Sequence, residues 1–221
     1  MVDRFVLGIN AYEHDTSACL LRNGEIVVAV NKERVTRIKH DQGFYQEVVD
    51  YCLKAAGIEL ERVDLVVRNC YVLPVREMER RLAHYHAPLY LTLHERGQTA
   101  ASTLFLSDSD RVVDISHHLA HAYSAFAVSP FERGAVMVVD GVGSYRADAT
   151  EAVPEGDEAH SLARESESYY RFDGEGIEAV KKVWMGPCPG FLSDEFYAMP
   201  GLGALYSRVS TYIFTDWNKC G

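Results

Sequence analysis

The chain has 221 residues, enough for one large domain or two lobes with a sizeable core. Its 48% hydrophobic and 24% charged residues are typical of a globular protein, and a formal net charge of -10 argues against a duplex nucleic-acid binder, which needs a basic face. No apolar run approaches the ~18 residues of a membrane span, and the start MVDRFVLGIN does not resemble a signal peptide. We therefore expect a cytoplasmic protein with neither nucleic acid nor membrane as a partner. The five cysteines form no CxxC pair, so neither a zinc ribbon nor a disulfide framework is expected.

Short apolar runs separated by turns predict strands near the start of the chain. Residues 5–10 (FVLGIN) predict a buried strand, and residues 16–21 and 25–30 predict a hairpin. An amphipathic pattern over 44–56 predicts a helix that ends at a glycine, and residues 63–69 predict a further strand. From residue 74 to residue 110 the pattern is mixed and mostly helical, and we assign no chemistry to it.

Two polar segments lie between these elements. His14 and Asp15 follow the first strand, where an imidazole could accept a proton and the neighbouring carboxylate could orient it; the alternative is a pair of ordinary turn residues. Arg34, Arg37 and Lys39 form a basic cluster with the adjacent histidine, either a solvated turn or an anion pocket.

The stretch DISHHLAHAYSAF, residues 114–126, predicts a helix with Ser116 as its N-cap, entered from a strand at 111–115. At about 100° per residue, His117 and His121 project in nearly the same direction, while His118 points elsewhere. The positive end of the helix dipole disfavours imidazolium and keeps the rings in the neutral form that a metal needs. The alternative is a helix whose histidines pack or are solvated, since the zinc-protease motif HExxH is absent.

A second strand and glycine-rich turn follow in AVMVVDGVGS, residues 135–144. Asp140 ends the apolar strand, where a carboxylate is costly unless it is paired or bound to a cation. Gly141, Gly143 and Ser144 offer backbone N–H groups to phosphate oxygens. Together with the two aligned imidazoles, Asp140 makes an N,N,O ligand set suited to zinc or ferrous iron; the alternative is an aspartate that caps a turn.

The chain begins the same unit twice. FVLGIN matches VMVVD, the turn RNG matches DGEG, and EIVVAV matches IEAVKKV, while residues 201–214 predict a further helix. We therefore expect an α/β protein with a duplicated ribonuclease-H-like fold. Residues 1–131 would form a complete first lobe and residues 132–221 an incomplete second lobe, with Asn10 and Asp140 facing a cleft between them.

Five segments together resemble the O-carbamoyltransferases of the NodU/CmcH type: GINAYEHDTSACLLRNGEIVVAV, ERVTRIKHD, SHHLAHAYSAF, VVDGVGS and, more loosely, PGLGALYSRVSTYIF. The resemblance implies the duplicated architecture of actin and the sugar kinases. It also implies a two-step reaction. A YrdC-like domain, absent from this chain, makes carbamoyl-adenylate from carbamoyl phosphate and ATP, and the present domain passes the carbamoyl group to a hydroxyl of a small-molecule or sugar acceptor.

The resemblance also implies roles for single residues. His117, His121 and Asp140 would hold a divalent metal, iron in preference to zinc, that binds the phosphate of the adenylate. His14 would be the general base, with Asp15 beside it, and the segment from Arg34 to Lys39 would steady the anionic donor. A further metal-binding aspartate and a glycine-rich nucleotide segment of the family would lie beyond Gly221, so we expect this chain to be inactive alone.

Two other function classes compete with this interpretation. A phosphotransferase on the same duplicated fold would need acidic residues at both strand ends for Mg²⁺, whereas Asn10 occupies the first. A non-catalytic partner module would bind no metal.

Overall fold

The computed structural model describes residues 2–11, 15–41, 45–69, 110–155, 159, 161–174, 176–186 and 201–215. The chain divides into two compact units, residues 1–115 and 116–221. The histidine-bearing helix lies in the second of these units, and the lobe boundary at residue 131 stays a prediction. Among the helices in the described ranges, none is both long and apolar enough to cross a bilayer.

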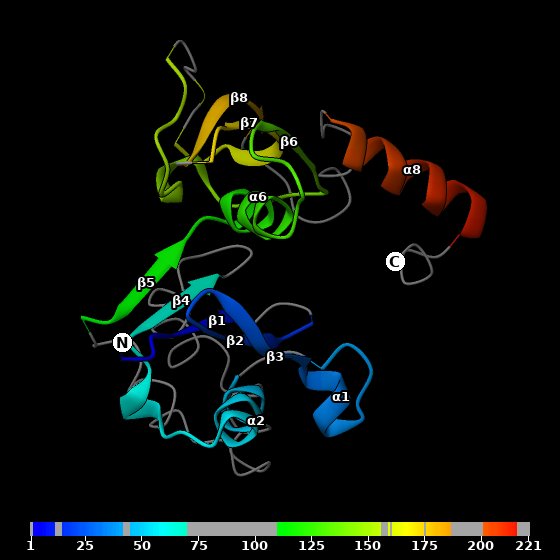
Figure 1. Ribbon diagram of the computed structural model, residues 1–221. Coiled ribbons are helices and arrows are strands. Elements are labelled where there is room, and N and C mark those ends of the chain that lie inside the picture. Colours follow the sequence, from blue (N-terminus) through cyan, green and yellow to red (C-terminus); the bar gives the residue numbers. More distant parts are fainter. Residues whose placement is uncertain are drawn as a thin grey trace. The chain divides into compact units, whose positions relative to one another are not determined.

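The first unit is built on a five-stranded sheet with the order β3-β2-β1-β4-β5 (Figure 1). Strands β1, β2 and β3 are antiparallel neighbours, whereas β4 runs parallel to β1 and β5 parallel to β4. Asn23 and Gly24 both have positive φ angles, the backbone form that a tight two-residue hairpin needs between β2 and β3. The strands are β1 (Phe5–Asn10), β2 (Ser17–Arg22), β3 (Glu25–Asn31), β4 (Leu65–Asn69) and β5 (Val112–Ile115).

Helix α2 (Gln46–Ala56) completes the core of the first unit. Alternate residues of β1 and β2 are buried, among them Leu7 and Leu20, and they share one core with Val48 and Cys52 of the helix. The helix ends at Gly57, whose φ of 66° suits a residue without a Cβ atom. The unit also contains the short helix α1 (Lys32–Thr36) and the 3₁₀ turn η1 (Leu60–Arg62).

The second unit contains a three-stranded antiparallel sheet with the order β6-β7-β8. Helix α6 packs against β6 and β7 (Figure 1). At this contact the rings of Phe126 and Phe172 lie 4.6 Å apart. The elements are α6 (His117–Ala127), β6 (Gly134–Val139), η2 (Arg146–Asp148), β7 (Arg164–Phe172), β8 (Ile177–Met185) and α8 (Leu202–Phe214).

The fold is therefore mixed α/β, as predicted. Each of the strands predicted in the described ranges is present, and the structure adds α1 where the sequence suggested a turn. The predicted start of α2 at residue 44 lies outside the described residues, and the helix begins at Gln46. Each unit contains three antiparallel strands that are neighbours in the sheet in chain order, β1 to β3 in the first unit and β6 to β8 in the second.

Candidate metal centre

Helix α6 places two imidazole rings side by side, one turn apart. His117 is buried, and the side chain of His121 is 53% exposed. The ring centroids lie 4.6 Å apart, and the two Nε2 atoms are separated by 3.1 Å. The i, i+4 spacing seen in the sequence thus aims both nitrogens at one point.

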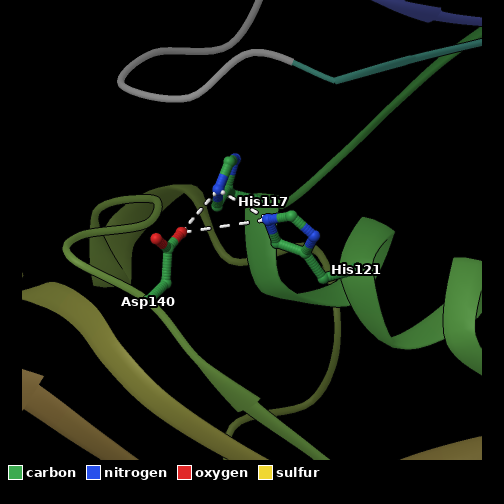
Figure 2. A group of neighbouring side chains, drawn as sticks. All are labelled: His117, His121 and Asp140. Atoms are coloured by element: carbon green, nitrogen blue, oxygen red, sulfur yellow. Dashed lines mark hydrogen bonds and ion pairs between the residues drawn. The ribbon is translucent and has the colours of Figure 1, made fainter. Parts of the chain in front are cut away.

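Asp140 follows β6 and turns its carboxylate toward the same point (Figure 2). Its Oδ2 atom lies 2.8 Å from Nε2 of His117 and 3.8 Å from Nε2 of His121. One donor atom from each of these residues lies within 4.8 Å of the others. The structure therefore brings together the three residues that the sequence suggested as ligands.

The spacing of these donors suits a shared cation. With ligand bonds of about 2.1 Å, two ligands of one ion stand about 3.0 Å apart at a right angle and about 3.4 Å apart in a tetrahedron. The observed separations of 2.8, 3.1 and 3.8 Å bracket these values. Burial favours the protonated form of Asp140, but the His117 ring and the Gly141 N–H group outweigh burial and hold the pKa of Asp140 below its ordinary value. An ionised carboxylate with two imidazoles is a donor set for zinc or ferrous iron.

The turn after Asp140 uses its N–H groups within the protein. Gly141 donates to Oδ1 of Asp140 at 2.6 Å, Gly143 donates to the Glu165 carbonyl at 2.7 Å, and Ser144 donates to Oε2 of Glu165 at 3.0 Å. Contact of these three N–H groups with a phosphate stays a prediction, and it would require these internal bonds to open.

The side chain of His118 points in another direction from those of His117 and His121, as predicted. It is fully buried, and its Nδ1 atom lies 2.7 Å from the hydroxyl oxygen of Ser168. Burial, with the His117 ring beside it, lowers the pKa of His118 to about 3, so this ring is neutral. It contributes to packing under α6 and not to the ligand set.

The N-terminal turn of α6 is held by the side chain of Ser144, which the sequence suggested only as a phosphate contact, and by that of Glu165, which the sequence did not single out. His117 N–H donates to the Ser144 hydroxyl at 2.9 Å, and His118 N–H donates to the Glu165 carboxylate at 3.2 Å. Glu165 in turn contacts the buried Lys182. No local signal names Glu165, because the run ESES at 165–168 is equally typical of the solvated side of a strand.

In the first unit, the predicted catalytic pair is only partly described. His14 lies outside the described residues, whereas Oδ1 of Asp15 lies 3.1 Å from Nδ1 of His40. Asp15 has a φ of 56°, the left-handed conformation that aspartate tolerates in turns. The loop geometry thus orients Asp15 toward His40.

The predicted basic cluster surrounds an acidic residue. Arg34 lies 3.3 Å and Lys39 lies 3.2 Å from the carboxylate of Glu33, and the His40 N–H donates to the same group at 3.1 Å. The His40 N–H and the Lys39 ammonium hold the pKa of Glu33 below its ordinary value. Arg37 is the left-handed C-cap of α1. Because Glu33 offsets charge here, any bound anion would compete with it for Arg34 and Lys39.

The mixed α/β fold, with two imidazoles and a carboxylate at one point, defines a class of α/β proteins with a candidate metal site. Comparison with known proteins supplies the family. The family described as Carbamoyltransferase N-terminus matches residues 5–103 and 84–217. The nodulation protein NolNO of Sinorhizobium fredii is 36% identical over 197 residues, which cover 86% of this chain and 28% of that protein. The uncharacterized protein sll1178 of Synechocystis sp. is 38% identical over 160 residues, covering 63% of this chain and 26% of that protein.

The chain belongs to the carbamoyltransferase family, in its N-terminal region. It spans about a quarter of the length of these two curated relatives, at 28% and 26%. Among solved structures, the activator of the 2-hydroxyisocaproyl-CoA dehydratase from Clostridium difficile with bound ADPNP matches with a TM-score of 0.44 and 14% identity, over 97% of this chain and 54% of that chain.

Proposed function

We propose that this chain contributes the metal-binding part of an O-carbamoyltransferase, which transfers a carbamoyl group from carbamoyl-adenylate to a hydroxyl of a small-molecule or sugar acceptor. The observation that carries the proposal is the convergence of His117, His121 and Asp140 in a member of the carbamoyltransferase family. The repeated antiparallel meander supports the duplicated ribonuclease-H-like fold for the two units.

The proposed cofactor is a divalent metal, iron in preference to zinc, held by His117, His121 and Asp140. Such a cation would neutralise the negative charge that develops on the leaving nucleotide. The carboxylate of Asp140 adds the negative charge that selects a cation over a neutral ligand.

The proposed transfer is an acyl substitution at the carbamoyl carbon. The acceptor oxygen forms a bond to that carbon, the bond from the carbon to the phosphate oxygen breaks, and AMP leaves with the bonding electron pair. The proton of the acceptor hydroxyl passes to His14, with Asp15 beside it as the orienting carboxylate. Arg34, Arg37 and Lys39 would steady the anionic donor, in competition with Glu33.

The donor would be made elsewhere. Carbamoyl phosphate and ATP would yield carbamoyl-adenylate on a YrdC-like domain outside these 221 residues, in the cytoplasm. We accordingly expect no carbamoyl transfer from carbamoyl phosphate and ATP by this chain alone.

Elemental analysis of the purified chain tests the metal centre directly. Expressed in iron- and zinc-supplemented medium, the wild-type chain should retain one of these metals through gel filtration, whereas His117→Ala and His121→Ala should lose it. The matched control is His118→Ala, which removes a neighbouring imidazole that faces Ser168 instead.

A chain without iron or zinc, or a metal content equal in wild type and in both ligand variants, would contradict the proposal and favour a non-catalytic module. Transfer itself is tested by adding synthetic carbamoyl-adenylate and candidate alcohols to a longer family member that contains this region, and following carbamoylated product by mass spectrometry. There, loss of product in the variant equivalent to His117→Ala is the expected result.

A further inference from the structure

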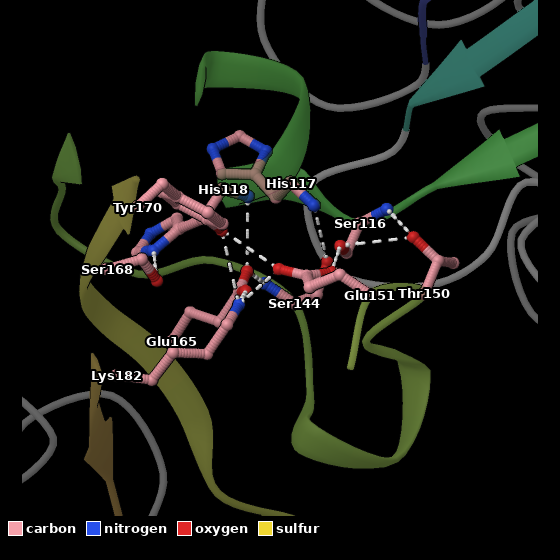
Figure 3. A network of polar contacts seen from close by, with 10 residues as sticks. All are labelled: Ser116, His117, His118, Ser144, Thr150, Glu151, Glu165, Ser168, Tyr170 and Lys182. Carbon is pink, nitrogen blue, oxygen red and sulfur yellow. Dashed lines mark hydrogen bonds and ion pairs between the residues drawn. The ribbon is translucent and has the colours of Figure 1, made fainter. Parts of the chain in front are cut away.

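Glu165 of β7 is a fully buried carboxylate that joins two segments of the second unit (Figure 3). Its Oε2 atom accepts the N–H group of His118 at 3.2 Å and that of Ser144 at 3.0 Å. The first amide belongs to the N-terminal turn of α6, and the second to the turn that follows Asp140. One oxygen thus links the backbone beside the histidine ligands to the backbone beside the aspartate ligand.

Backbone hydrogen bonds reinforce the same link. Gly143 N–H donates to the carbonyl of Glu165 at 2.7 Å, and Glu165 N–H donates to the carbonyl of Ser144 at 2.9 Å. The hydroxyl of Ser144 accepts the N–H group of His117 at 2.9 Å. A Cβ atom on Gly143 would lie only 2.6 Å from Oε2 of Glu165 and 2.8 Å from Nε2 of His118. The turn after Asp140, β7 and α6 are therefore closely packed at this point.

Lys182 of β8 is the counterion of this buried carboxylate. Its ammonium group donates to Glu165 and to Glu151, and it lies 3.3 Å from the hydroxyl of Tyr170. The side chains of Lys182 and Glu165 are both fully buried. An isolated carboxylate in such a place is costly, and the contact with the ammonium of Lys182 offsets that cost and holds the Glu165 side chain in place.

We propose that Glu165 and Lys182 form a positioning pair that sets the separation between the two histidine ligands and Asp140, and so sets the affinity of the centre for metal. The inference rests on the proposed function, because it assigns the pair a purpose at that metal centre. Neither side chain is a ligand: Glu165 acts through backbone amides, and Lys182 acts through Glu165.

A double-mutant cycle tests the pair. Glu165→Gln keeps the shape, but while the ammonium of Lys182 remains, the amide group must point its NH₂ either at that ammonium or at the two backbone N–H groups. Lys182→Met leaves the carboxylate without its cation. We expect each single substitution to weaken Co²⁺ binding about tenfold or more, which is the usual range for residues that orient ligands.

The double variant separates positioning from a general loss of stability. Without the ammonium, the introduced glutamine can offer its oxygen to both amides, so the double variant should bind Co²⁺ better than the product of the two single effects predicts. Lys181→Met, at the exposed neighbour on β8, is the matched control and should bind like wild type. The visible absorption of bound Co²⁺ reports the coordination, and hydrogen exchange of the metal-free chain reports the amides of His118 and Ser144.

The outcomes are distinct. Wild-type affinity and exchange rates in both single variants would overturn the positioning pair and leave the metal centre intact. If the wild-type chain binds no Co²⁺, the metal centre of the proposed function is overturned. The exchange rates of His118 and Ser144 then decide alone whether the pair holds α6 against the turn: faster exchange in Glu165→Gln than in Lys181→Met supports it, and equal rates refute it.

Discussion

In each unit, the described residues include a buried charged side chain that lies against a partner of opposite charge. In the first unit, the buried guanidinium of Arg68 lies 2.9 and 3.2 Å from the two carboxylate oxygens of Asp114. In the second unit, Lys182 lies between Glu151 and Glu165. Removing one member of such a pair leaves the other charged and dehydrated, and that cost governs the expected effect of substitution.

The Arg68–Asp114 pair has an exposed counterpart that isolates the effect of burial. Arg171 and Glu178 are also paired across two strands, at 2.6 Å, but their side chains are 67% and 65% exposed. We expect Asp114→Ala to lower the free energy of unfolding by about 3 kcal/mol. Glu178→Ala should cost less than about 1 kcal/mol, because water replaces the lost partner. Urea unfolding of both variants measures the difference, and equal losses would contradict the argument from burial.

Glu151 makes the stability of the second unit dependent on pH. Burial favours its protonated form, but the Lys182 ammonium and the Ser116 hydroxyl outweigh burial and hold the pKa of Glu151 below its ordinary value of 4.5. The unfolded chain therefore takes up this proton first as the pH falls. The contribution to stability is full above pH 4.5 and is lost as the pH falls through the lower, folded-state pKa.

Comparison of wild type with Glu151→Gln tests this dependence. Urea unfolding at several values from pH 6 down to pH 3 should show wild type more stable at the upper end, with the difference shrinking below about pH 4.5. A constant difference across that range would mean that the charge of Glu151 does not stabilise the fold.

At the scale of elements, α6 shows how much a local pattern can predict. The helix begins at the predicted N-cap, Ser116, and the two candidate ligands, His117 and His121, share one face. The Ser116 hydroxyl nevertheless makes no capping bond and donates to Glu151 instead. The side chains of Ser144 and Glu165 instead accept hydrogen bonds from the first two helical N–H groups. Capping partners this distant in the sequence produce no periodic pattern around the helix, so they could not be predicted from the sequence.

Helix α8 begins against the turn that carries the aspartate ligand. A Cβ atom on Gly203, its second residue, would overlap the backbone carbonyl of Asp140, and the Leu202 N–H group donates to Glu167 at 2.8 Å. In an open helix, replacing glycine by alanine stabilises by about 1 kcal/mol. Here we expect Gly203→Ala to destabilise the chain by about 1–3 kcal/mol, because either α8 or the Asp140 backbone must move.

Thermal unfolding followed by circular dichroism measures this effect, and Co²⁺ titration shows whether the shift reaches Asp140. Gly176→Ala is the control, because a Cβ atom there meets nothing within 4 Å. A Gly203→Ala chain as stable as wild type would show that α8 does not rest on the turn as described.

At the scale of the molecule, the strands could be predicted and the long-range polar contacts could not. Short apolar runs between turns indicated the strands of both sheets. Asp140 could be named as a candidate ligand because it ends a strand in a repeated pattern. Glu165 and Lys182 face each other from β7 and β8, and nothing in their local sequence distinguishes them from charges on a solvated face.

The grouping of α6 with β6 and β7 makes a prediction for the whole chain, since His117, His121 and Asp140 all lie in the unit of residues 116–221. A metal that binds only the folded state adds stability as RT ln(1 + [L]/Kd), about 2.7 kcal/mol at a free concentration 100 times Kd. Co²⁺ should therefore slow hydrogen exchange at α6 and the turn after Asp140, and leave β1 to β3 of the first unit unchanged.

Hydrogen exchange with mass spectrometry measures each segment separately. The His121→Ala chain is the control, because the His121 ring is exposed and its removal disturbs packing least among the three candidate ligands. Equal slowing in both units would place the binding of Co²⁺ elsewhere, whereas slowing confined to the second unit and absent in His121→Ala would tie the stabilisation to these three side chains.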